Sequence, residues 1–252
     1  MRIAIQLFGH LRTYKRTCEN FNENIVGANA SDADCDIDVF MHTWDELEAR
    51  TSTWHSDNEG LRGQRLTQLD IEVLKGCYTS LKNIEISPSI DAHGSKISRG
   101  KVSRLRERYE EDKGIQYDWI IETRPDVLFN NLLRIKEFID TFEEEQLILN
   151  GITADNVVLC GNGIFSRMNI AHPNYVCEGD MIYFYKSDVS WDTATRVPVD
   201  YLFLRDFQFL RDGRGEGKAV RNKKQGLAKK LLLQVVAGII PSKLIRKKIR
   251  SL

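Results

Sequence analysis

Short apolar runs alternate with longer polar stretches over the first 210 residues, and this alternation limits the folds open to the chain. The apolar runs, expected to be strands, are residues 3–8, 37–42, 83–86, 117–122, 146–150, 156–160 and 181–185. The stretches expected to be helices are residues 11–25, 98–113, 132–142 and 200–210. Strands alternating with helices predict an α/β fold with a mostly parallel sheet flanked by helices. The polar residues 45–65 are expected to form a long surface loop.

The charged residues divide the chain into two parts. Its 252 residues carry 36 Lys and Arg against 36 Asp and Glu, but no acid follows Glu216 and eleven of the cations lie in residues 218–252. We therefore expect one domain over residues 1–215 and a basic tail over residues 216–252. The tail has no interleaved aromatic residues and no recognisable nucleic-acid-binding motif, so nucleic acid is not an expected partner.

Cysteine usage and hydropathy predict a cytoplasmic location. The five cysteines are scattered without a CxxC motif, which favours reduced thiols over a disulfide scaffold or a zinc site. No stretch reaches the roughly 18–20 apolar residues that span a bilayer. The N-terminus carries no signal-peptide pattern.

Polar residues follow the first predicted strand, at the kind of strand end where parallel α/β sheets bind ligands. They are Gly9, His10 and Arg12. Gly9 permits close approach of the backbone to a ligand, and Arg12 offers a bidentate contact to a phosphate. The alternative is a tight turn with a surface arginine. Neither a GxGxxG nor a GxxxxGK[ST] motif occurs, so the dinucleotide-binding and P-loop classes lack their signature.

The second predicted strand runs into His42, Thr43 and Trp44. An aromatic plane beside an imidazole suits the face of a sugar or a base, because both stack on aromatic rings and hydrogen-bond. The alternative is that Trp44 caps the core and His42 is buried with its hydrogen bonds satisfied.

The fourth predicted strand runs directly into two acids with an arginine between them, Glu122, Arg124 and Asp126. Carboxylates at such a strand end suit Mg²⁺ or Mn²⁺, which bind phosphate oxygens, and Arg124 suits an acid or a phosphate. We expect Asp126 to be exposed there. The alternative is a surface turn with an Arg–carboxylate pair.

Three later acids are candidates for proton transfer. Glu178 and Asp180 precede the apolar run 181–185, and Asp200 opens the predicted helix 200–210. A carboxylate in one of these places could act as general base for an acceptor hydroxyl. For Asp200 the alternative is an ordinary helix N-cap.

The end of the basic tail is predicted to form a cationic amphipathic helix. Ser242 is a candidate N-cap, and apolar residues follow on one face with Lys and Arg mostly on the other. Such a helix is typical of binding to an anionic membrane surface. The alternative is a terminal helix whose apolar face packs on the domain.

Three segments together resemble a known family: IAIQLFGHLRTY at the start, DVFMHTWDE, and YDWIIETRPDVLF. The chain resembles, over residues 1–210, bacterial cell-envelope polysaccharide glycosyltransferases of the GT-A type (WavE-like), which act on lipopolysaccharide or capsule. The resemblance implies a Rossmann-like sheet, a nucleotide-sugar donor and a divalent metal, Mg²⁺ or Mn²⁺. It places the metal at Asp126 and the donor loop at Gly9 to Arg12. The family's DxD motif is replaced here by Arg124-Pro125-Asp126, in which Arg124 is expected to compensate part of the diphosphate charge.

The residues and the resemblance together predict a cytoplasmic glycosyltransferase, peripheral on the inner face of the cell membrane. It would transfer a sugar to a hydroxyl of a growing, lipid-linked envelope glycan, with Asp200 or Glu178 as the base. Two alternatives remain open. One is transfer of another phosphate-linked group to the same glycan, and the other is a non-catalytic subunit that binds glycan or lipid.

Overall fold

The structure of the chain is a computed structural model that describes residues 1–30, 34–50, 59–90, 94–129, 132–141, 157–161, 182–190, 195–198 and 207–209. The candidate acids Glu178, Asp180 and Asp200 lie outside the described residues, as does the basic tail, residues 216–252. No helix among the described residues is long and apolar enough to cross a membrane.

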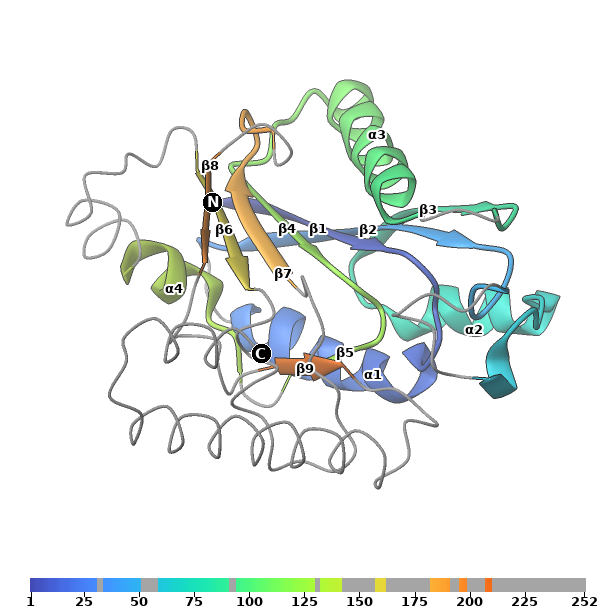
Figure 1. The fold of residues 1–252 in the computed structure, drawn as a ribbon. Helices are drawn as coiled ribbons and strands as arrows, with labels where there is room; N and C mark the ends of the chain where they lie inside the picture. Colours follow the sequence, from blue (N-terminus) through green and yellow to red (C-terminus); the bar gives the residue numbers. More distant parts are fainter. Residues whose placement is uncertain are drawn as a thin grey trace, which may run out of the picture. The chain divides into compact units, whose positions relative to one another are not determined.

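A seven-stranded sheet organises the described part of the chain (Figure 1). In spatial order its strands are β3 (Leu81–Ser87), β2 (Asp36–Trp44), β1 (Arg2–Phe8), β4 (Trp119–Thr123), β7 (Ile182–Lys186), β6 (Val157–Gly161) and β8 (Thr195–Pro198). The first four are parallel, and β7 runs antiparallel to both of its neighbours. A second, two-stranded sheet pairs β5 (Val127–Phe129) with β9 (Phe207–Phe209). The predicted α/β, mostly parallel, Rossmann-like sheet is therefore confirmed.

Helices cover both faces of this sheet. The helices are α1 (Tyr14–Phe21), which continues as the π-helical segment η1 (Asn22–Gly27), α2 (Gln68–Cys77), α3 (Ser95–Lys113) and α4 (Ile135–Thr141). In Figure 1, α3 lies on one side of the sheet and α1 on the other. The side chains of β1 show the same division, because Ile5 packs in one apolar cluster with Tyr14 of α1, whereas Ala4 packs in another with Val102 of α3. Burial on both faces explains why β1 reads as a continuous apolar run.

The face under α3 also buries a polar group that includes Glu122. The hydroxyl of Tyr185 donates to Glu122 Oε1 at 2.7 Å, and Nε of Arg99 lies 3.4 Å from Oε2. The guanidinium of Arg99 lies between the rings of Phe8 and Tyr183, at 4.4 and 3.8 Å from their centroids. Glu122 therefore belongs to the packing of α3 on the sheet, and its predicted place beside Asp126 in one cation site is wrong.

Three local expectations differ from the structure. Helix α2 was not predicted; Thr67 begins it with a capping box, in which Thr67 and Asp70 satisfy each other's backbone N–H groups. Residues 45–65 are not simply a loop, because Glu46 pairs with Arg65 and Glu48 with Arg62 in isolated β-bridges. Residues 207–209, expected to be helical, form strand β9 against β5.

Candidate functional site

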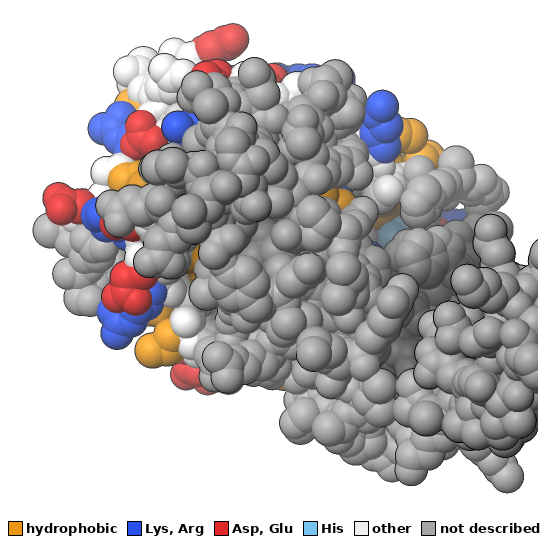
Figure 2. Space-filling view, turned by 60° about the vertical axis from the view of Figure 1, so that its left-hand side comes forward, with side chains coloured by type: hydrophobic (Ala, Val, Ile, Leu, Met, Phe, Trp, Pro, Cys, Tyr) orange, Lys and Arg blue, Asp and Glu red, His pale blue; other side chains and the backbone are white. Residues whose placement is uncertain are grey.

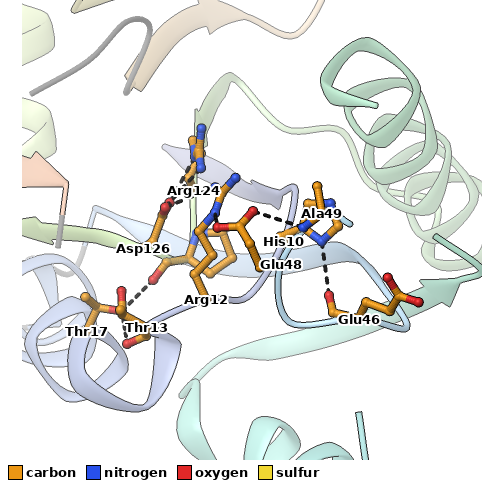
Figure 3. A network of polar contacts seen from close by, with 10 residues as sticks. His10, Arg12, Thr13, Thr17, Glu46, Glu48, Ala49, Arg124 and Asp126 are labelled. Carbon is orange, nitrogen blue, oxygen red and sulfur yellow. Dashed lines mark hydrogen bonds and ion pairs between the residues drawn. The ribbon is translucent and has the colours of Figure 1, made fainter. Parts of the chain in front are cut away.

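Three neighbouring strands bring charged residues to one edge of the sheet (Figure 3). Arg12 follows β1, Glu48 follows β2 and Asp126 follows β4. Because β2, β1 and β4 are adjacent and parallel, their carboxyl ends meet at the same edge. Arg12 lies between the two acids: its Nε donates to Glu48 Oε2 at 2.5 Å, and its NH1 group donates to Asp126 Oδ2 at 3.1 Å.

A second arginine completes this cluster, which we call the strand-end cluster (Arg12, Glu48, Arg124 and Asp126). Arg124 donates from Nε to Asp126 Oδ1 and from its NH2 group to Oδ2, each at 2.9 Å. Asp126 thus accepts from two guanidinium groups and is 0% exposed. The prediction that Asp126 is an exposed strand-end acid is wrong, because the two arginines allow the carboxylate to be buried.

The cluster is electrically balanced, with two cations and two anions. Burial lowers the pKa of the Arg12 guanidinium, but the carboxylates of Asp126 and Glu48 outweigh it, and the pKa of Arg12 lies above its ordinary value. Basic and acidic side chains also lie next to one another on the described part of the surface in Figure 2. The strand-end cluster differs from these surface pairs in being buried, as the Arg99–Glu122 pair under α3 also is.

The backbone after β1 is constrained where it carries these groups. Gly9 has a φ of +97° and Arg12 a φ of +45°, in the region that L-residues with a Cβ seldom adopt. The N–H of Arg12 donates to the carbonyl of Leu47 at 3.0 Å, which ties this turn to the loop after β2. A left-handed arginine held by ion pairs and a backbone hydrogen bond is the kind of local strain that clusters at functional sites.

His10 lies in the same loop, and one of its ring nitrogens already makes a hydrogen bond to the backbone. Its Nδ1 lies 3.0 Å from the carbonyl oxygen of Glu46, which can only accept, so Nδ1 carries the proton. Burial is the largest of the effects on this imidazole and lowers the pKa of His10 below its ordinary value. Neutral His10 therefore has Nε2 available to accept a hydrogen bond, and no described residue donates to it.

Trp44 and His42 match the alternative stated for them, because both are buried, and Thr43 between them is buried as well. Thr43 is 0% and Trp44 3% exposed. The Trp44 ring packs on Gly94 so closely that a Cβ there would lie 2.7 Å from Trp44 Cζ2, and the ring of His42 meets it edge-on at 5.0 Å. Neither side chain offers an open surface to a ligand in this arrangement.

The acids at this edge do not fit a divalent metal. Both oxygens of Asp126 already accept from arginines, and Glu48 accepts from Arg12 through one oxygen and from the N–H of Ala49 through the other. Within the described residues there is no group of three or more His, Cys, Asp or Glu that could hold a metal ion. A cation at Asp126 would have to displace guanidinium groups from a buried carboxylate, so Arg12 and Arg124 fill the place that the resemblance gives to the metal.

Sequence reasoning missed two members of this site. Glu48 was placed in a surface loop, yet it is 0% exposed and binds Arg12. Thr17 of α1, also buried, donates to the carbonyl of Pro125 at 2.5 Å and so supports the turn that carries Asp126. The only sequence signal for Glu48 is its spacing from Glu46, since two acids two residues apart after a buried strand can direct both side chains to the same side.

Comparisons with known proteins add little to this geometry. Neither protein-family profiles nor curated protein sequences match the chain. Among solved structures, it is similar to a protein of Bacillus anthracis assigned as a glucose-1-phosphate thymidylyltransferase, solved with sucrose, at 11% identity and a TM-score of 0.34 over 74% of this chain and 72% of that one. It is also similar to HddC of Yersinia pseudotuberculosis, solved with GMP-PN, at 13% identity and a TM-score of 0.33 over 84% and 89% of the two chains. TM-scores this low do not establish a shared activity.

Proposed function

We propose that the protein is a glycosyltransferase that moves a sugar from a nucleotide-diphosphate donor to a hydroxyl of a growing envelope glycan. The observation that carries the proposal is the convergence of Arg12 and Arg124 at the carboxyl edge of parallel strands. Ligands of such sheets bind at that edge, and guanidinium groups pair with phosphates through two parallel hydrogen bonds. The sequence resemblance to cell-envelope glycosyltransferases supplies the reaction class.

In this reaction the acceptor oxygen bonds to the anomeric carbon of the donor sugar while the bond from that carbon to the diphosphate breaks. The electron pair of the broken bond remains on the leaving nucleoside diphosphate. Charge on that group has to be stabilised as it develops, and positioned cations in a water-poor site do this well. Arg12 and Arg124 take this role, and no step depends on a metal.

Arg124 is the better placed of the two to reach a ligand. Its side chain is 10% exposed against 6% for Arg12, and it forms an ion pair with Asp126, two residues away in the same turn. The strand-end cluster carries no net charge before a ligand binds. A diphosphate therefore binds most favourably if Arg124 turns from Asp126 towards the phosphate oxygens. Arg12 then remains to hold the Asp126 carboxylate.

The loop after β1 provides the rest of the donor site. Gly9, which has no Cβ, allows the backbone to approach the nucleotide closely. His10 accepts an N–H or O–H of the donor at Nε2. Deprotonation of the acceptor stays assigned to Asp200, Glu178 or Asp180, which lie outside the described residues.

Attachment to the inner face of the membrane completes the proposal. It rests on the sequence of residues 218–252, which hold eleven cations and no acid. Anionic lipid attracts each Lys or Arg near its surface by about 1 kcal/mol, so several suffice for reversible binding. A lipid-linked acceptor would then share a plane with the enzyme.

The test is calorimetric titration with UDP-, GDP-, CMP- and dTDP-sugars, with and without a chelator, followed by an assay, with envelope glycan as the acceptor, for the released nucleotide, which is a nucleoside diphosphate from the UDP-, GDP- or dTDP-sugar and CMP from the CMP-sugar. One of the four is expected to bind and to be cleaved, equally well with the chelator present. Arg124→Ala should weaken its binding about tenfold or more, the equivalent of one charged hydrogen bond. Arg134→Ala is the matched control, because Arg134 pairs with Glu137 at an exposed position.

Three results would count against the proposal. If none of the four nucleotide sugars binds, the protein does not use this class of donor. Release of a nucleoside monophosphate from a UDP-, GDP- or dTDP-sugar would indicate transfer of another phosphate-linked group. Binding without any cleavage, with the glycan acceptor present, would indicate a non-catalytic subunit.

A further inference from the structure

His42 of β2 is buried with a hydrogen-bond partner on each side of its ring. Its Nδ1 lies 2.7 Å from the hydroxyl of Ser98 on α3, and its Nε2 lies 3.0 Å from the hydroxyl of Ser87 at the end of β3. His42 and Ser98 are both 0% exposed. The imidazole therefore ties α3 and β3 to β2, the strand beside β3.

Ser98 extends this connection to the loop after β1. The N–H of Gly9 donates to Ser98 Oγ at 2.8 Å. Gly9 is the left-handed residue at which the chain leaves β1, directly before His10 and three residues before Arg12. One buried hydroxyl thus holds the first peptide of the loop that carries two of the proposed donor-binding side chains.

The distances indicate which way the protons point. Ser98 accepts from Gly9, so its own proton is free for His42 Nδ1 at 2.7 Å, a shorter contact than the 3.4 Å to the carbonyl of His42. His42 Nε2–H then donates to Ser87, and Ser87 donates to a carboxylate oxygen of Glu85 at 3.0 Å. This arrangement gives every proton an acceptor and keeps the hydrogen bond to the charged group.

Burial and the charges around His42 together keep its imidazole neutral. Burial is the largest effect, and together with Lys101, Arg104 and His10, and against the opposing effect of Glu85, it lowers the pKa of His42 to about 4. Lys101 also donates to both Glu85 and Ser87. At neutral pH the imidazole can therefore accept from Ser98, which a doubly protonated ring could not do.

We propose that Ser98 is a positioning residue for the donor-binding loop: its hydroxyl, oriented by His42, fixes the Gly9 peptide and with it the directions of His10 and Arg12. The inference rests on the proposed function for its consequence in catalysis. Its structural part, that Ser98 holds the loop, does not depend on that function.

The test compares two proteins that each lose one buried hydroxyl. Ser98→Ala removes the acceptor of the Gly9 N–H. Tyr117→Phe is the control, because Tyr117 donates to Asp38 at 2.6 Å near the amino ends of the strands, away from the loop. Amide hydrogen exchange of residues 9–12 should rise tenfold or more in Ser98→Ala and stay at the wild-type rate in Tyr117→Phe. Ser98→Thr, which keeps the accepting oxygen, should restore the protection.

The same variants separate positioning from general stability. With the nucleotide sugar that the wild type binds, Ser98→Ala should raise the donor KM about five- to tenfold and change kcat less, whereas Tyr117→Phe should leave the donor KM unchanged. Equal exchange rates in the two variants, or equal donor KM values, would overturn the proposal. A wild type that binds none of the four nucleotide sugars would overturn the proposed function instead, and the exchange rates would still decide whether Ser98 holds the loop.

Discussion

Neutralising Asp126 tests whether the strand-end cluster is as buried and as paired as its distances indicate. Asp126→Asn changes the shape of the side chain little, but it removes the charge that faces both Arg12 and Arg124. The cluster then holds two cations against Glu48 alone. One guanidinium is left in a site with little access to water, where its charge is uncompensated.

The size of the effect follows from that imbalance. Removing one partner of a buried ion pair costs about 3–5 kcal/mol of the free energy of unfolding. For a protein of this size, each kcal/mol lowers the melting temperature by roughly 2–4 °C, so we expect a fall of roughly 6–20 °C. An exposed strand-end acid would lose about 0–1 kcal/mol instead.

Urea unfolding of matched variants measures this difference. Asp140→Asn is the control, because Asp140 pairs with Lys136 and both side chains are more than 40% exposed. Adding Arg124→Gln to Asp126→Asn rebalances the charge and should recover at least about 1 kcal/mol. If Asp126→Asn were no more damaging than Asp140→Asn, or if the two changes at 124 and 126 were simply additive, the cluster would not be a coupled buried network.

Three further predictions follow from the same residues and from the tail. Arg12→Ala should both lower the free energy of unfolding by about 3–5 kcal/mol and weaken nucleotide binding, and an unchanged calorimetric affinity would leave Arg12 with a structural role alone. Because folding lowers the pKa of His42 from 6.5 to about 4, the unfolded chain binds more protons between these values, and stability should fall by up to about 3 kcal/mol as the pH drops from 6.5 to 4. His42→Gln should lose that part of the pH dependence in urea titrations. Deleting residues 218–252 should abolish salt-sensitive binding to anionic liposomes but spare activity on a soluble acceptor, whereas loss of both activities without any lipid dependence would favour a packed terminal helix.

The sequence predicts the fold better than it predicts the contacts within the site. Strands such as β1 and β4 are apolar enough to be recognised locally, and their order as parallel strands places Arg12 and Asp126 at one edge. The pairing of Arg12 with Glu48 joins residues 36 apart, and its pairing with Asp126 joins residues 114 apart. No local pattern encodes such partners, because they meet only after the strands have aligned.

The two missed elements, α2 and β9, have different physical origins. Helix α2 buries only Leu74 and leaves Leu69 exposed, so its apolar stripe is weak and its clearest signal is the capping box at Thr67. Strand β9 has three residues and owes its conformation to pairing with β5, far away in the sequence. Strand β9 therefore depends on a tertiary contact that overrides local propensity, whereas the capping box of α2 is a local signal.

Joining three strands through the buried charges of the strand-end cluster costs free energy. Replacing buried ion pairs by apolar residues of similar volume is often neutral or stabilising by about 1–4 kcal/mol, so stability alone gives no reason to keep four charges here. Arg12 adds a left-handed backbone, which costs a residue with a Cβ about 1–2 kcal/mol. The buried charges and the left-handed backbone of Arg12 are two destabilising features at the edge where parallel α/β sheets bind ligands. A function that needs pre-positioned guanidinium groups explains them better than packing does. Under the proposed function, Glu48 and Asp126 act as counter-charges that keep Arg12 and Arg124 in position until the nucleotide-diphosphate donor takes over part of the pairing.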